Sequence, residues 1–389
     1  MPVVSLEKLK HAVIDGSVGA ITVDTSVVER HQFGFESGVL AKLAQFSHAE
    51  TDHIVLDIVL HEIRSHLRSE ADLVRSQVKN ALKPLGNSWG IEKSDRDAAL
   101  TLLFGEQGGE ARTEQRLLTF LQDSSAVLLT CSELVSLNDV LSRFVGTKAP
   151  FGNTEAKKHE FPDAVALLAL EAWAVKNEKA VIAVSRDADW KRYCIDSHRV
   201  YFIEDLAQAL SAFQADADDA STLLGALLAE GKVPNLDEII LEGIRSQSDK
   251  IDVDMEASAS WYYEFELYNI EVSSEALLAD QVKVFDVVEF EDNALVIKTS
   301  LALDVTAHFS VNFQAWDGID REYLSAGSAS IQQTERMVLE VILTMVFGNG
   351  TATIDSVELL PSSSTMYFGE IEPDWMNDRA GPVDNEPTD

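Results

Sequence analysis

Acidic side chains stand directly after short apolar segments in the first half of the chain. Asp24 follows AITV (20–23), and Asp187 and Asp189 follow VIAV (181–184). In an open sheet of parallel strands, ligands bind beyond the carboxyl ends of the strands, where loops from neighbouring strands converge. If the first and fourth strands flank the point where the strand order reverses, both segments deliver a carboxylate to the same crevice.

Glu62 is a third candidate, because it lies in a helical segment but outside the apolar seam of that helix. Val59, Ile63 and Leu67 follow one another in helical spacing, and Glu62 stands beside them. A carboxylate that apolar side chains half cover is expected to be paired or to bind a metal ion.

Asp163 is a fourth candidate, near the start of the long apolar helix pattern in KKHEFPDAVALLAL (157–170). Pro162 suits the first turn of a helix, and the positive end of the helix dipole favours a carboxylate there. The helix runs directly into VIAV, so its start is expected at the same end of the sheet as the strand ends.

Converging carboxylates without fixed cations raise one another's pKa values, and a divalent ion removes that penalty. Oxygen-rich sites select hard ions such as Mg²⁺ or Mn²⁺, and two ions about 4 Å apart can support phosphodiester hydrolysis. Each acid also has an ordinary structural explanation, as a helix start, helix flank, helix cap or solvated turn. Their combination, at corresponding strand ends, favours a metal site.

Five short, β-branched segments separated by helical patterns must position these acids. They are residues 20–23, 53–56, 126–129, 181–184 and 200–203. Such segments predict an α/β fold, a doubly wound parallel sheet of about five strands with helices on both faces. This domain is expected to span residues 1–210, with a helical insertion near 69–122.

A change of period marks a second domain. Residues 211–238 combine an acidic run with a short helix pattern and a Gly/Pro break, so they are expected to be a connector. Aromatic and β-branched segments with partial alternation predict a mainly antiparallel β domain over 239–371. The polar residues 372–389 are expected to be a disordered tail.

Charge separates the two halves of the 389-residue chain. The formal net charge is −34, of which about −7 falls in the first 210 residues and about −27 in the remainder. A strongly acidic half repels phosphate backbones, so nucleic acid is expected to bind the first half. Trp261, Tyr262 and Tyr263 are therefore expected to be buried sheet aromatics and not a platform for bases.

Two further features bear on the compartment. No apolar run of about 18 residues occurs, and MPVVSLEKLK lacks the basic segment followed by an apolar segment that marks a signal peptide. A cytoplasmic protein without a membrane partner is therefore expected. Cys131 and Cys194 are too few for a disulfide framework or a zinc site and are expected to be small buried side chains.

Asp24 in VDTS, Glu62 in LHEIRSHL, Asp163 in KKHEFPDAV and Asp187 in VSRDADW together resemble the PIN-domain superfamily of metal-dependent nucleases. The string KKHEFPDA looks particularly like the larger PIN-like proteins of bacteria. The resemblance covers roughly residues 18–210. It implies an endonuclease in which the four acids bind Mg²⁺ or Mn²⁺, acting on RNA in preference to DNA, with a role in toxin–antitoxin systems or anti-phage defence.

The resemblance also assigns supporting residues. Ser26 and Ser185 match the small hydroxyl positions that hydrogen-bond the acids. Asp189 could replace or supplement Asp187, and the sequence leaves that choice open.

Polar residues ahead of the helix complete the set of candidates. Lys157, Lys158 and His159 are candidates for contacting the scissile phosphate, although a solvated charged loop is the more ordinary explanation. Glu160 is expected to support the metal ligands and not to bind metal directly.

The acidic second half leaves several roles open: self-association, docking of a basic protein partner, or an acidic shield over the nuclease site. A non-catalytic alternative also stays open, in which the PIN-like fold is a scaffold and the β domain mediates protein–protein interaction. All four acidic positions are filled, which favours the enzyme.

Overall fold

The computed structural model describes residues 5–105, 109–152, 160–214, 217–274, 276–291, 293–319 and 321–377. The chain divides into two compact units. The first comprises the residues up to 219 together with 286–290, and the second comprises 220–285 and the residues from 291 onward. The linear division expected from the sequence did not anticipate that 286–290 would group with the first unit.

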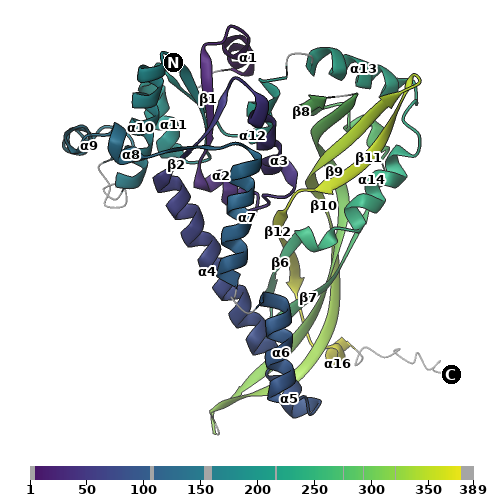
Figure 1. The fold of residues 1–389 in the computed structure, drawn as a ribbon. Helices are drawn as coiled ribbons and strands as arrows, with labels where there is room; N and C mark the ends of the chain where they lie inside the picture. Colours follow the sequence, from purple (N-terminus) through teal and green to yellow (C-terminus); the bar gives the residue numbers. More distant parts are fainter. Residues whose placement is uncertain are drawn as a thin grey trace, which may run out of the picture. The chain divides into compact units, whose positions relative to one another are not determined.

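The first unit contains a five-stranded parallel sheet flanked by helices, which confirms the predicted fold class (Figure 1). The strands lie in the order β3-β2-β1-β4-β5. Their bounds are β1 Val18–Val23, β2 Asp52–Leu56, β3 Val127–Leu129, β4 Ala180–Val184 and β5 Val200–Ile203. Each overlaps one of the five segments expected from the sequence.

The strand order reverses between β1 and β4, the two strands that deliver Asp24 and Asp187. They pair in parallel, with Val23 opposite Val184, so both strands end at the same level. All residues of β4 are buried, and so are all but one of β1. Central strands of a parallel sheet are covered on both faces, which explains their uninterrupted apolar sequence.

Two long helices begin at this end of the sheet. α4 (Asp57–Ala81) follows β2 directly, and its buried residues, Val59, Leu60, Ile63 and Leu67, all lie in its first half. α10 (Phe161–Asn177) carries Pro162 in its first turn and ends at Glu178, which adopts a left-handed conformation at φ 56°. Both helices therefore start beside the strand ends, as the sequence predicted.

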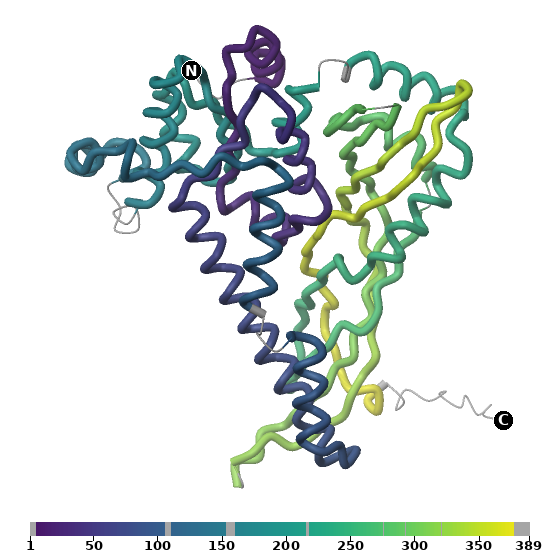
Figure 2. Tube along the Cα trace, in the orientation of Figure 1, coloured from purple at the N-terminus to yellow at the C-terminus, as the bar shows by residue number. Residues whose placement is uncertain are grey.

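The second half of α4 continues past its last buried residue and lies beside α6 (Figure 2). α7 packs along the first half of α4, where Arg64 pairs with Glu114 at 2.8 Å. No residue of α6 is buried. The helices of this region are α5 Pro84–Ser88, α6 Lys93–Phe104 and α7 Gly109–Asp123. They account for the segment in which a helical insertion was expected.

Shorter helices complete the first unit. They are α1 Leu6–Ile14, α2 Thr25–Arg30, α3 Gly38–Ala41, η1 Lys42–His48, α8 Cys131–Leu134, α9 Leu137–Val145, α11 Ala188–Asp196 and α12 Leu206–Ser211. Within β8 (Phe285–Glu291), Glu289 pairs with Lys42 at 2.8 Å. The backbone N–H of Phe290 donates to Gln214 at 3.1 Å. These contacts account for the grouping of 286–290 with the first unit.

The second unit is built around an antiparallel sheet, as predicted, with strands in the order β11-β10-β9-β7. Their bounds are β7 Tyr262–Ser273, β9 Ala294–Asp317, β10 Glu322–Gly348 and β11 Thr351–Leu359. Leu301, Leu303, Val305, Ala307 and Phe309 alternate along β9 and are fully buried. This period of two places the core on one face of the sheet.

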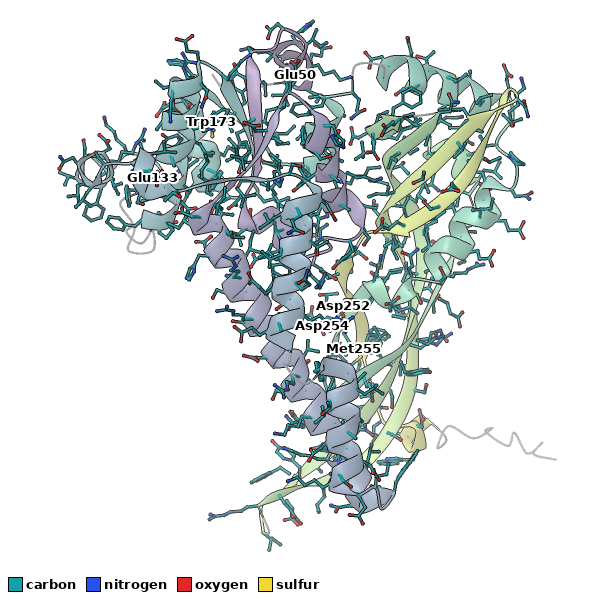
Figure 3. The ribbon with its side chains drawn as sticks, viewed as in Figure 1. Glu50, Glu133, Trp173, Asp252, Asp254 and Met255 are labelled. Carbon is teal, nitrogen blue, oxygen red and sulfur yellow. The ribbon has the colours of Figure 1, made fainter. Side chains whose placement is uncertain are left out.

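A separate parallel pair joins β6 (Ile251–Ser258) to β12 (Ser362–Glu370). Ile251, Val253 and Met255 are buried, whereas Asp252 and Asp254 between them are exposed (Figure 3). The same strand therefore contributes both to the core and to the acidic surface of this unit.

The remaining helices are α13 Ala217–Ala229, α14 Leu236–Arg245, η3 Ser248–Lys250, α15 Leu278–Gln281 and α16 Asp374–Asn377. α14 packs on β11, where a Cβ added at Gly243 would lie 2.6 Å from Val357, so only glycine permits this approach. α13 lies within the expected connector. α16 lies within the expected tail, and Trp375 donates a 2.8 Å hydrogen bond to the carbonyl of Ala326.

The exposure of individual side chains tests two expectations from the sequence. Tyr262 is 53% exposed, so the expectation of a buried aromatic was wrong there, whereas Trp261 and Tyr263 are half-buried. Tyr262 lies at the start of β7 and stacks against Tyr323 with ring centroids 5.1 Å apart. Cys131 and Cys194 are both buried, as expected. Within the described parts of the chain, no helix is long and apolar enough to span a membrane.

Candidate active site

Asp24 lies at the carboxyl end of β1 and is only 5% exposed. Its Oδ1 accepts a 2.8 Å hydrogen bond from the backbone N–H of Thr25, and so caps α2. Its Oδ2 accepts hydrogen bonds from Ser26 Oγ at 2.5 Å and from Ser185 Oγ at 2.8 Å. Burial raises the pKa of Asp24, the two serine hydrogen bonds lower it, and repulsion from Asp163 raises it further.

The same residues tie the ends of β1 and β4 together. The backbone N–H of Asp24 donates to the carbonyl of Val184 at 2.9 Å. Ser26 Oγ also accepts a 3.1 Å hydrogen bond from the backbone N–H of Arg186. The Asp24 carboxylate is therefore held by groups from both sides of the strand-order reversal.

Glu62, one and a half turns into α4, is joined to the end of β1 by Thr25. Thr25 Oγ1 donates a 3.0 Å hydrogen bond to Glu62 Oε2. Burial raises the pKa of Glu62, the Thr25 hydrogen bond lowers it, and repulsion from Asp163 and Asp24 raises it. Sequence reasoning missed Thr25 as a site residue, although it directly follows Asp24.

Asp163 lies in the first turn of α10 and is held by α11. Trp190 Nε1 donates a 2.8 Å hydrogen bond to Asp163 Oδ1. Burial, a hydrogen bond with Glu160 and repulsion from Asp187 raise the pKa of Asp163 to about 7, against the lowering effect of Trp190. Trp190 is fully buried and was also missed, since an apolar position in a helix is the ordinary assignment for tryptophan.

Asp187 and Asp189 lie in different surroundings. Asp187 caps α11, accepts a 2.6 Å hydrogen bond from the backbone N–H of Asp189, and repels Asp163. Its own backbone N–H donates to Ser185 Oγ at 3.0 Å. The carboxylate of Asp189 is buried and forms an ion pair with Arg192 at 2.9 Å. Asp187 thus interacts with the other acids, whereas Asp189 has its own cation.

Glu160 is half-buried at the N-terminal cap of α10, where it hydrogen-bonds Asp163. Lys157, Lys158 and His159, the candidates for contacting a phosphate, lie outside the described residues.

The four acids thus reach one region of the first unit from β1, α4, α10 and the end of β4. Among the described residues, hydroxyl, indole and backbone groups donate hydrogen bonds to these acids, and no Lys or Arg does. The part of the chain that the structure describes contains no group of three or more His, Cys, Asp or Glu side chains arranged to hold a metal ion. Mg²⁺ usually keeps several waters and uses one or two protein carboxylates, so these oxygen donors still suit it.

Residues 21–190 match the sequence model of the family described as PIN domain. This segment contains all four acids and extends from β1 to the start of α11. Together with the parallel five-stranded sheet, the match identifies a PIN-like domain at residues 21–190, followed by a domain with an antiparallel β sheet. PIN domains are typically nucleases.

No curated protein matches the chain. Among solved structures, the chain has a similarity to the crystal structure of the intermembrane space region of chloroplast protein ARC6. The two are 12% identical, the match covers 38% of this chain and 99% of that chain, and the TM-score is 0.11. A TM-score this low carries no argument about fold or function.

Proposed function

We propose that this protein is a metal-dependent endonuclease that hydrolyses phosphodiester bonds, with RNA preferred over DNA. The observation that carries the proposal is the shared environment of Asp24, Glu62 and Asp163. They come from three separate elements, influence one another's charge state, and all have raised pKa values. A cluster of partly buried acids with perturbed pKa values is typical of a functional site.

In this proposal Asp24, Glu62, Asp163 and Asp187 hold Mg²⁺ or Mn²⁺. A bound divalent ion would activate water and stabilise the charge that develops on the phosphate oxygens. Thr25, Ser26 and Ser185 orient the carboxylates, because their hydroxyls donate to Glu62 and Asp24. Trp190 fixes the orientation of Asp163.

The net reaction is hydrolysis. A bond forms between a water oxygen and phosphorus, the ester bond to one nucleoside breaks, and that leaving oxygen takes a proton. The preference for RNA and a role in toxin–antitoxin systems or anti-phage defence depend on the likeness to PIN nucleases. The net charge of the second half of the chain, about −27, is unfavourable for binding nucleic acid and suits a basic protein partner or self-association.

The test is cleavage of labelled single-stranded RNA, single-stranded DNA and duplex DNA by the full-length protein with Mn²⁺ or Mg²⁺. Asp24→Asn and Asp163→Asn are expected to lower kcat at least about 100-fold, and chelation should abolish cleavage. Asp196→Asn is the matched control, because Asp196 is an exposed acid at the end of α11.

Cleavage that survives both active-site substitutions unchanged would contradict the proposal. The scaffold alternative predicts no cleavage by the full-length protein and no increase in Tm with Mn²⁺. The nuclease proposal predicts that Mn²⁺ raises the Tm of the wild type and much less that of Asp24→Asn, because binding stabilises the folded state.

A further inference from the structure

A cavity lies between the start of α4, the segment from α8 into α9, and the start of α10. Its volume is about 520 Å³, within the range of small-molecule sites. We call it the side pocket and define it by six of its lining residues, Ile58, His61, Ser132, Leu137, Phe161 and Val165.

The chemistry of the side pocket favours a flat ligand without a negative charge. Ile58, Leu137, Phe161 and Val165 supply apolar walls, and the polar groups include Asp57, His61 and Ser132. Among the described residues that line the cavity, none is Lys or Arg. A phosphate group would therefore find no cation there, whereas a nucleobase has apolar faces and hydrogen-bonding edges that match both kinds of group.

The aromatic wall of the pocket is fixed in place. The ring of Phe161 packs against Phe144 and Phe151, with centroids 5.2 and 5.0 Å apart. Phe151 belongs to a buried cluster with Val140 and Ala164. Phe161 nevertheless remains 37% exposed, so part of its ring is available to a ligand.

The position of the pocket links it to the acids. Ile58 lines the pocket and Glu62 follows it by four residues on α4, so the two side chains are neighbours on one side of the helix. On α10, Phe161 faces the aromatic cluster and Asp163 faces Trp190. Two residues apart on a helix, Phe161 and Asp163 point to opposite sides of α10. The pocket therefore adjoins the acids through α4, where Ile58 and Glu62 share one side.

We propose that the side pocket binds an unpaired base of a nucleotide adjacent to the scissile phosphate. This inference rests on the proposed nuclease function and deepens it, because a base can enter the pocket only when it is not paired. Single-stranded RNA, or an unpaired stretch of a structured RNA, is then the substrate class.

Binding tests the proposal without requiring cleavage. The full-length Asp24→Asn chain is titrated with a short single-stranded RNA and with the same RNA carrying one abasic residue at each position in turn. Loss of the base at one position is expected to weaken binding about tenfold, the size of one base–aromatic stacking interaction. Abasic residues elsewhere should have smaller effects.

Matched variants then locate the base. Leu137 and Val145 lie on α9 and are 71% and 80% exposed, but only Leu137 lines the pocket. In the Asp24→Asn background, Leu137→Ser should remove the preference for the intact RNA, and Val145→Ser should keep it. Phe161→Leu should weaken the preference and Phe161→Tyr should retain it, since tyrosine keeps the ring.

The outcomes distinguish failure of the pocket proposal from failure of the nuclease proposal. The pocket proposal is overturned if the Asp24→Asn chain binds neither the intact nor the abasic RNAs, or binds them all equally. It is also overturned if the preference for the intact RNA persists after Leu137→Ser and Phe161→Leu are added. A base preference that depends on the pocket, with no cleavage by the wild type, would support the pocket and refute the nuclease. Metal-dependent cleavage without any base preference would do the reverse.

Discussion

Thr25 contacts two of the four acids at once: its hydroxyl donates to Glu62 Oε2 at 3.0 Å, and its backbone N–H donates to Asp24 Oδ1 at 2.8 Å. Thr25 is the first residue of α2 and is buried. A single residue at the end of β1 therefore fixes the orientation of a carboxylate on its own segment and of another on α4. This relationship makes Thr25 a positioning residue of the proposed active site.

Replacing Thr25 with valine removes the hydroxyl and keeps the shape and the backbone hydrogen bond. Cleavage is expected to fall about tenfold in kcat, because a hydrogen bond to a charged group contributes on the order of 1.5–3 kcal/mol and part of this orients Glu62. Thr25→Ser retains the hydroxyl and should recover most of the activity. Equal kcat values for Thr25→Val and the wild type, measured at saturating metal, would remove Thr25 from the site.

Asp187 and Asp189 should respond differently to the same substitution. Asp187→Asn is expected to lower kcat at least tenfold with little change in Tm, because Asp187 interacts with Asp163 and lies half-buried. Asp189→Asn is expected to lower Tm and to leave more activity, since it deprives Arg192 of its ion-pair partner. Parallel measurement of kcat and thermal unfolding checks both, and the reverse pattern would make Asp189 the fourth acid.

The raised pKa of Asp163 predicts how stability depends on pH. The folded state holds this proton up to a pKa of about 7, whereas an unfolded aspartate releases it near 4. The folded protein therefore binds more protons between these values, and the contribution of Asp163 to the free energy of unfolding falls as pH rises through about 7. Without metal, Asp163→Asn should flatten this loss and stabilise the protein at pH 8 relative to the wild type.

Metal binding provides a second test of the charge state of Asp163. A divalent ion favours ionised Asp163, so Mn²⁺ should raise Tm more at pH 8 than at pH 6. The control is the same pair of titrations with Asp163→Asn, in which the pH dependence should shrink. A Mn²⁺ effect that is equal at both pH values would contradict the role of Asp163 as a ligand.

His53 predicts the opposite slope at acid pH. It is buried on β2, and its Nδ1 lies 2.9 Å from Ser124 Oγ. Because the Ser124 hydroxyl donates to the carbonyl of Phe120 at 2.8 Å, Nδ1 of His53 is the donor in this contact. Burial lowers the pKa of His53 to about 4, so the unfolded state binds more protons between about 4 and 6.5.

The contribution of His53 to the free energy of unfolding should therefore decrease as pH falls through that window, by an amount on the order of 3 kcal/mol. Asp163 has the opposite effect over the same range, so denaturant titrations at pH 7 and pH 4.5 measure the loss in the Asp163→Asn background. His53→Gln should reduce the difference between the two pH values, whereas Ser124→Ala, which keeps the imidazole, should preserve it. A pH dependence that is the same with and without His53→Gln would show that other groups cause the loss.

In the second unit, the local sequence pattern predicts only part of the strand β10. The apolar pattern of residues 336–347 predicts a strand, but β10 also includes the preceding residues 322–335, whose pattern does not. These residues include three Ser and two Gln and are mostly exposed, so they lack the apolar alternation that marks a strand. Their strand conformation follows from pairing with β9 over its whole length.

The sequence by itself determined the five-stranded parallel sheet and the antiparallel character of the second domain. Strands buried on both faces must be apolar throughout, and this requirement is visible in short segments such as VIAV. The sequence also pointed to Asp24, Glu62, Asp163 and Asp187, because each stands next to a strand end or a helix start at one edge of that sheet. Their roles in catalysis stay predictions.

Only the tertiary structure decided how those acids are held. Thr25 reaches Glu62 across 37 residues, and Trp190 reaches Asp163 across 27. The ion pair with Arg192 separates Asp189 from Asp187, although the two acids stand two residues apart. Such partners depend on which helix faces which strand end in space, and local composition carries no record of that geometry.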